Sequence, residues 1–205
     1  MKNKLLLLFF LLGVFFPLSA QESEVLISTS HTSLLLSTSQ GGELKFLYYG
    51  RKLTDADVHA IVSTESGSFS AYPVYGLNCP SESALSVQHE DGNMTLQMEV
   101  IGVETTHQEK ANLTVISLKD KVYPFYVKLC YKAYQDVDVI EAWTEISHKE
   151  KKNVKLNQFA SAYLPVRKGN VWLSSLYGAW ANEARLVQEP LEPGMKVIKN
   201  KDGVR

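Results

Sequence analysis

The chain has 205 residues, with 21 Lys and Arg against 22 Asp and Glu, a formal net charge of −1, and 45% hydrophobic residues. A charged fraction of 21% with so balanced a charge excludes an intrinsically disordered chain and argues against a nucleic-acid partner. The length also excludes a complete (β/α)8 barrel, which needs about 250 residues. What remains is a globular chain of ordinary composition.

Residues 1–20 have the pattern of a secretory signal peptide. Lys2 and Lys4 precede an apolar run over residues 5–16, and Ala20 provides a small residue for cleavage. The run is shorter than the roughly 20 residues that span a bilayer. We therefore predict cleavage after Ala20, export to the periplasm or the cell exterior, and no membrane contact after cleavage. The alternative is an uncleaved N-terminal anchor.

Residues 21–205 are then expected to form one domain. Period-two alternation dominates this region and predicts an all-β fold, an antiparallel β-sandwich with few or no helices after the signal peptide. One short helical turn is predicted at 55–61. The predicted strands are 25–29, 33–38, 43–49, 85–90, 93–98, 113–118, 122–134, 139–147, 154–164 and 171–177.

Asp91-Gly92 predicts a hairpin, because this dipeptide suits a two-residue type I′ turn. That register would place Glu90 opposite Asn93 and Val87 opposite Leu96, with the apolar side chains on one face. His89 would lie at the turn end of that face. We expect it to be a rim residue half covered by Met94, not a ligand or a base.

Strand 139–147 places an indole among carboxylates. Glu141, Trp143 and Glu145 alternate with apolar residues and so share one face. An indole can cover the apolar face of a pyranose while carboxylates accept hydrogen bonds from its hydroxyl groups. Trp143 is therefore a candidate sugar contact, and packing beneath a neighbouring domain is the alternative.

No catalytic or metal-binding pattern emerges from the residues themselves. The sequence has no Gly-x-Ser-x-Gly, no Cys-x-x-Cys, no His-Glu-x-x-His and no glycine-rich phosphate loop, and it predicts no metal and no cofactor. Cys79 and Cys130 are the only cysteines. Two cysteines do not make a disulfide framework, so unpaired, mostly buried thiols are favoured over a bridge, which stays open.

The C-terminal residues predict half of a hairpin. Residues 197–201 read as a strand and Asp202-Gly203 as a turn, after which only two residues follow. We therefore expect the chain to be cut short at its C-terminus. Whether this reflects biology or a break in the gene model stays open.

Three motifs in order resemble a known family. They are Tyr72-Pro73-Val74-Tyr75-Gly76, the stretch 84–93 that ends His89-Glu90-Asp91-Gly92-Asn93, and Leu176-Tyr177-Gly178-Ala179-Trp180 continued through residue 194. Together they resemble the N-terminal β-domain, a supersandwich, of glycoside hydrolase family 36, the α-galactosidases, in the form typical of Bacteroides-like bacteria. The resemblance covers about residues 69–205 and, more weakly, the segment from Glu22.

The resemblance implies a function for the complete enzyme. Such enzymes hydrolyse terminal α-galactosides with retention, using two Asp residues that must lie about 5–5.5 Å apart. In the family both belong to a catalytic barrel, where Lys-Trp-Asp marks the nucleophile; this motif is absent here. We therefore assign no catalytic residue and expect the chain alone to be inactive. The implied partners are the barrel domain, an α-galactoside bound through the complete enzyme, and further copies in a homo-oligomer.

Two family motifs supply the remaining candidate sugar contacts. A Tyr-Gly-x-Gly-Asp loop of the family reaches the sugar site, but here it reads Tyr75-Gly76-Leu77-Asn78-Cys79, so the carboxylate is missing and a plain turn is the alternative. Tyr75 and Asn78 are kept as candidates. Trp180, followed by Glu183 and Arg185, matches the family tryptophan motif and implies either sugar stacking or packing at a domain junction. A free-standing carbohydrate-binding or interaction module is the alternative function.

Overall fold

A computed structural model describes residues 23–38, 42–64, 69–76, 82–166, 169–179, 182–192, 194 and 196–198. The chain divides into two compact units, Met1–Leu164 and Pro165–Arg205. Within the described ranges, no helix has the length and apolar character needed to cross a membrane.

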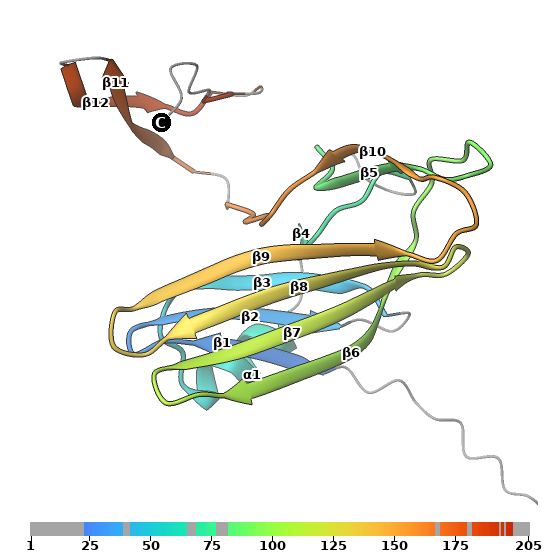
Figure 1. Cartoon of the computed structure of the whole chain (residues 1–205). Helices are drawn as coiled ribbons and strands as arrows, with labels where there is room; N and C mark the ends of the chain where they lie inside the picture. The colour runs from blue at the N-terminus through green and yellow to red at the C-terminus, as the bar shows by residue number, and fades with distance from the viewer. Residues whose placement is uncertain are drawn as a thin grey trace, which may run out of the picture. The chain divides into compact units, whose positions relative to one another are not determined.

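The first unit contains a four-stranded antiparallel sheet with the strand order β1-β2-β3-β4 (Figure 1). Its strands pair in register from Glu24↔Ser37 to Phe46↔Phe69. The strands are β1 (Glu24–Ser28), β2 (Thr32–Thr38), β3 (Leu44–Arg51) and β4 (Phe69–Ser70).

A second four-stranded antiparallel sheet follows the order β6-β7-β8-β9. Its strands are β6 (Met98–His107), β7 (Ala111–Asp120), β8 (Phe125–Tyr134) and β9 (Val139–His148). The prediction for 122–134 and 139–147 is confirmed almost to the residue. β6 is not predicted, since the expected strand 93–98 ends where β6 begins; a bulge at Ile101, between the pairs Val100↔Leu118 and Gly102↔Ser117, interrupts the alternation of β6.

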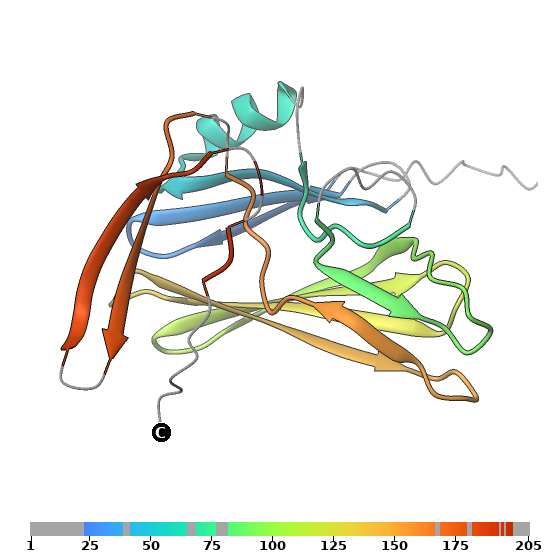
Figure 2. The same cartoon turned by 90° about the horizontal axis from the view of Figure 1, so that it is seen from above.

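The two sheets form stacked layers (Figure 2). One continuous core joins their facing sides, with Leu34 and Leu36 of β2, Ile116 of β7, and Phe125 and Leu129 of β8 all at most 5% exposed. Burial of one such side chain contributes about 1.5–3 kcal/mol relative to exposure. The predicted antiparallel β-sandwich is confirmed.

Helix α1 (Asp55–Ser63) covers the other side of the first sheet (Figure 2). Thr54 caps it: its hydroxyl accepts from the Asp57 N–H and the Asp57 carboxylate accepts from the Thr54 N–H at 2.9 Å, a reciprocal capping box. Val58 packs against Leu35 and Leu47. The helix predicted at 55–61 is thus confirmed and is two residues longer.

The predicted Asp91-Gly92 hairpin is wrong in register. The His89 N–H donates to the Asn93 carbonyl at 2.8 Å, which encloses a three-residue turn, and Gly92 has φ +89°. The reason is local: the Asp91 carboxylate accepts from the Asn93 N–H at 2.9 Å, an Asx turn that pulls Asn93 out of the predicted pairing.

β5 (Leu85–Gln88) therefore pairs elsewhere. Its partner is β10 (Lys155–Phe159), with Val87 opposite Leu156 and not Leu96. The predicted strand 154–164 is accordingly shorter than expected, and 93–98 contains only an isolated bridge at Leu96 before β6 begins.

The second unit is a hairpin of β11 (Trp172–Ala179) and β12 (Asn182–Pro190). β12 was not predicted. Val197 and Ile198, expected to start a strand, are exposed and lie outside any strand. The Asp202-Gly203 turn lies outside the described residues.

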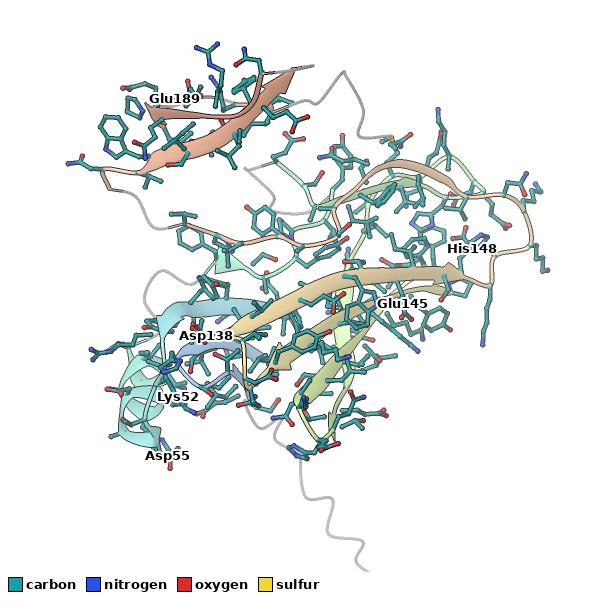
Figure 3. The ribbon with its side chains drawn as sticks, turned by 60° about the vertical axis from the view of Figure 1, so that its left-hand side comes forward. Lys52, Asp55, Asp138, Glu145, His148 and Glu189 are labelled. Atoms are coloured by element: carbon teal, nitrogen blue, oxygen red, sulfur yellow. The ribbon has the colours of Figure 1, made fainter. Side chains whose placement is uncertain are left out.

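One end of the sandwich is fastened by Asp138, in the turn between β8 and β9 (Figure 3). Its carboxylate accepts from the Thr29 hydroxyl, from the Thr32 hydroxyl at 3.3 Å and from the His31 N–H at 3.3 Å. Thr29 and His31 lie in the β1–β2 turn and Thr32 is the first residue of β2, so Asp138 joins the two sheets. The hydrogen bonds, that from Thr29 above all, lower the pKa of Asp138.

The Asp138 contact should make the stability depend on pH. A lowered folded-state pKa stabilises the fold above the unfolded-state pKa of about 3.9, and this contribution is lost as the pH falls through the folded-state value. Asp138→Asn keeps the left-handed backbone tolerable (φ 52°). We expect its free energy of unfolding in urea to lie below that of the wild type at pH 7, with a smaller difference at pH 3.

Asp136→Asn is the matched control, because Asp136 is exposed in the same turn. It should leave the urea midpoint nearly unchanged at both pH values. An equal loss in the two variants, or a loss for Asp138→Asn that does not change with pH, would contradict the role given to Asp138.

Candidate functional site

Trp143 lies on the solvent side of the β6–β9 sheet. Its neighbours along β9, Ala142 and Thr144, point toward the core side, while Trp143 pairs across the strands with Cys130 of β8. The indole is half-buried. The predicted sidedness of strand 139–147 is confirmed.

The carboxylates beside Trp143 are held by hydrogen bonds on the same face. The Trp143 Nε1–H donates to Glu145 Oε1 at 3.2 Å, and the Tyr134 hydroxyl donates to Glu141 Oε2 at 3.0 Å. Figure 3 shows Glu145 projecting from β9. Each carboxylate offers about four acceptor positions, so each can accept a further donor.

Cys130 lies beneath this face as a buried, free thiol. Burial, with a contribution from the nearby Glu145 carboxylate, raises its pKa. The thiol therefore stays protonated near neutral pH and is a poor nucleophile. The prediction of a free, buried thiol is confirmed for Cys130; Cys79 lies outside the described residues.

Tyr75 and Gly76 are the first two residues of the stretch that corresponds to the Tyr-Gly-x-Gly-Asp motif of the family. The Tyr75 N–H donates to the Leu85 carbonyl at 2.8 Å, and its carbonyl accepts from the Leu96 N–H at 3.0 Å. Gly76 has φ +140°, and a Cβ there would lie 2.9 Å from Thr95 Cγ2 and 3.0 Å from the Leu96 nitrogen. Glycine is therefore required, and Tyr75, 49% exposed, is held at a fixed backbone position.

The remaining candidates are not assembled into one site. Tyr75 and Trp143 lie on different elements, and no hydrogen bond or ring contact joins them in the described part of the chain. Asn78 and Trp180 lie outside the described residues. Glu183 and Arg185 are exposed on β12.

No metal centre is found in the portion of the chain that the structure describes: there, no group of three or more His, Cys, Asp and Glu side chains is arranged to hold an ion. Trp143 is the described candidate that has ordered carboxylates beside it, so the candidate site is the β8–β9 face around Trp143.

His89 and Glu150 form a buried polar pair that the sequence does not predict. His89, expected at a half-covered rim, has a fully buried side chain, and its Nδ1 lies 2.8 Å from Glu150 Oε1, whose side chain is 2% exposed. The imidazole stacks on Tyr123 with ring centroids 3.7 Å apart and meets Phe125 edge-on. The rim prediction for His89 is wrong because Tyr123 stacks on the ring and Glu150 of the β9–β10 loop, 61 residues away in the chain, meets its Nδ1.

Two glutamates tie this loop to the turn after β5. Glu150 Oε2 accepts from the Glu90 N–H at 3.1 Å, and Glu90 Oε2 accepts from the Lys152 N–H at 2.8 Å. The exchange fixes where β10 begins and so supports its pairing with β5. His89 and Glu150 are therefore structural residues, not members of a binding site.

Removing Glu150 should destabilise the first unit strongly. Glu150→Ala leaves the buried His89 Nδ1 without its partner, and a buried polar group left unpaired costs about 1–3 kcal/mol. We expect that loss in the free energy of unfolding measured with urea. Glu109→Ala, at an exposed turn position, is the control and should stay within about 0.5 kcal/mol of the wild type.

The double variant His89→Phe with Glu150→Leu distinguishes the cost of an unpaired buried polar group from the cost of lost packing. It should lose much less than Glu150→Ala, because two apolar side chains leave no buried polar atom unpaired. A loss below about 1 kcal/mol for Glu150→Ala would show that the pair does not hold the loop.

Comparison with known proteins gives the family. The model of the glycosyl hydrolase family 36 N-terminal domain matches residues 42–205. The chain is 28% identical over 99 residues to α-galactosidase Mel36A of Lactobacillus acidophilus, an alignment covering 48% of this chain and 14% of that protein.

Solved structures share the fold. The α-galactosidase from Lactobacillus brevis superposes with a TM-score of 0.74 at 20% identity, over 88% of this chain and 29% of that one. A variant of α-galactosidase AgaA from Geobacillus stearothermophilus, in complex with raffinose, gives 0.72 at 20% identity, over 84% and 28%. The chain thus spans less than a third of these proteins. Because the family model matches most of its length, the chain belongs to glycosyl hydrolase family 36, in which it corresponds to the N-terminal domain.

Proposed function

We propose that this chain is the leading β-domain of an α-galactosidase that hydrolyses terminal α-galactosides, and that it has no hydrolase activity of its own. The match of residues 42–205 to the N-terminal domain of the family carries the proposal. Two similar proteins of known structure, both AgaA variants, are complexes with raffinose and stachyose. The family resemblance implies that the reacting carboxylates belong to the barrel of the complete enzyme. The Lys-Trp-Asp motif that marks the nucleophile does not occur in these 205 residues.

The role that follows for the domain is to support the catalytic barrel. The resemblance gives the barrel as its partner and adds further copies of the chain in a homo-oligomer. The resemblance implies that the loop after Tyr75 approaches a sugar site, and backbone hydrogen bonds hold Tyr75 and Gly76 where that loop begins. Asn78 and Cys79 stand where the family has Gly and Asp, so this loop contributes no carboxylate there.

The absence of activity is tested by assaying the purified chain on a chromogenic α-galactoside such as p-nitrophenyl α-galactoside. We expect release of nitrophenol at the buffer rate, because the chain supplies no paired nucleophile and acid. An authentic α-galactosidase assayed in parallel shows that the substrate and conditions are adequate. Turnover above buffer that survives further purification would contradict the proposal.

We also propose that the chain is exported to the periplasm or beyond, with residues 1–20 as the signal peptide. The basic start, the apolar run and Ala20 support this proposal. When the gene is expressed in a Gram-negative host, the intact mass and N-terminal sequence of the product should show a mature chain that begins at Gln21. Ala20→Leu should impair cleavage, because the site requires a small residue. A full-length product starting at Met1 in the cytoplasm would contradict export.

A further inference from the structure

The β8–β9 face carries a symmetric set of side chains that the proposed function does not use. Across the two strands Lys128 pairs with Glu145, Cys130 with Trp143, and Lys132 with Glu141. We call these six residues the Trp143 strip. An indole thus lies at its centre, with one lysine and one glutamate on either side.

The polar groups of the strip are oriented before any ligand arrives. Glu145 accepts a hydrogen bond from the Trp143 indole and Glu141 accepts one from the Tyr134 hydroxyl, and both carboxylates keep further acceptor positions. The Lys132 ammonium lies 5.0 Å from the centroid of the Tyr134 ring. Acceptors are therefore held on both sides of the indole, and an ammonium donor on the Lys132 side, at little further entropic cost.

The charge of the strip matches a neutral ligand. Its two lysines and two glutamates cancel, so an anion or a cation gains no net attraction. The Cys130 thiol beneath the indole adds no charge, because its pKa is raised by burial. A neutral molecule rich in hydroxyl groups can use every carboxylate and ammonium group present.

We propose that the Trp143 strip is a carbohydrate-binding site in which the Trp143 indole stacks on a pyranose and Glu141 and Glu145 accept hydrogen bonds from its hydroxyl groups. An indole provides the flat apolar surface for the C–H face of the ring. The choice of an α-galactoside as the sugar rests on the proposed function. Such a site would hold an oligosaccharide on this domain.

The test is a titration of the isotope-labelled 205-residue chain with raffinose, followed by nitrogen–proton NMR. The three tryptophans give three indole signals, and Trp143→Phe identifies the one concerned. We expect a saturable shift of the Trp143 indole and of the β8–β9 amides. Mannitol at equal concentration controls for solvent effects.

Variants separate the strip from other aromatic surfaces. Trp143→Ala should abolish the saturable shift of the β8–β9 amides, and Glu141→Gln with Glu145→Gln should raise the dissociation constant at least about tenfold, since charged acceptors form the stronger hydrogen bonds. Trp172→Phe, at a 63% exposed position on β11, is the matched control and should bind as the wild type does. Dispersed amide spectra confirm that each variant is folded.

Maltotriose, an α-glucoside, separates this inference from the proposed function. Saturation by raffinose supports both. Saturation by maltotriose alone keeps the strip as a sugar site but contradicts the α-galactoside assignment. If neither sugar gives saturation, the Trp143 strip is not a sugar site. The same holds if the β8–β9 shifts depend on protein concentration and not on sugar, because a second copy then covers the face. Both results overturn this inference and leave the proposed function unaffected.

Discussion

The strict alternation of side chains along β8 and β9 is the constraint on which the rest of the structure depends. Phe125, Val127 and Leu129 are each at most 2% exposed in the core between the sheets. Because successive residues point to opposite faces of a strand, the side chains of Lys128 and Cys130 must point to the outer face. The composition of the Trp143 strip is therefore a consequence of the core, and a shift of one residue would bury charge and expose the core together.

Polar contacts at the ends of the sandwich complement this apolar core. Asp138 joins the β8–β9 turn to the β1–β2 turn, and the His89–Glu150 pair joins the β9–β10 loop to the turn after β5. Asp120, 1% exposed, accepts from the Val122 and Tyr123 N–H groups in the turn before β8 and from the Gln97 N–H just before β6, at 2.7–2.8 Å. Such contacts specify which loops meet, because a buried polar group without its partner is costly.

The fold class, most strands and the outward face of strand 139–147 could be predicted from the sequence. The predictions that failed did so for physical reasons. Strands β8 and β9 follow from unbroken alternation, whereas the short helix predicted at 55–61 is explained by the Thr54 cap and the acidic first turn that the structure shows. The Asp91-Gly92 register failed because Asp91 also forms an Asx turn, which a dipeptide rule ignores. β6 escaped notice because of the bulge at Ile101, and β12 because Asn182–Pro190 has no regular period.

The candidate site was predictable only in part. The sharing of a face by Glu141, Trp143 and Glu145 is a local property of β9 and was predicted. The opposing Lys128, Cys130 and Lys132 required the β8–β9 register, which short-range patterns do not supply. The pairing of His89 with Glu150 and of β5 with β10 depends on contacts between distant segments, for which the sequence carries no local signal.

The central claim is that a shared core fixes which face of β8 and β9 meets solvent. Side-chain nuclear Overhauser contacts in the labelled chain test it most directly. The account predicts contacts of Val127 and Leu129 methyls with Leu34 or Leu36 methyls across the sandwich, and of the Trp143 indole with Cys130 and Glu145 protons. Contacts of the Trp143 indole with Leu34 or Leu36 would contradict it, since they would place the indole inside the core.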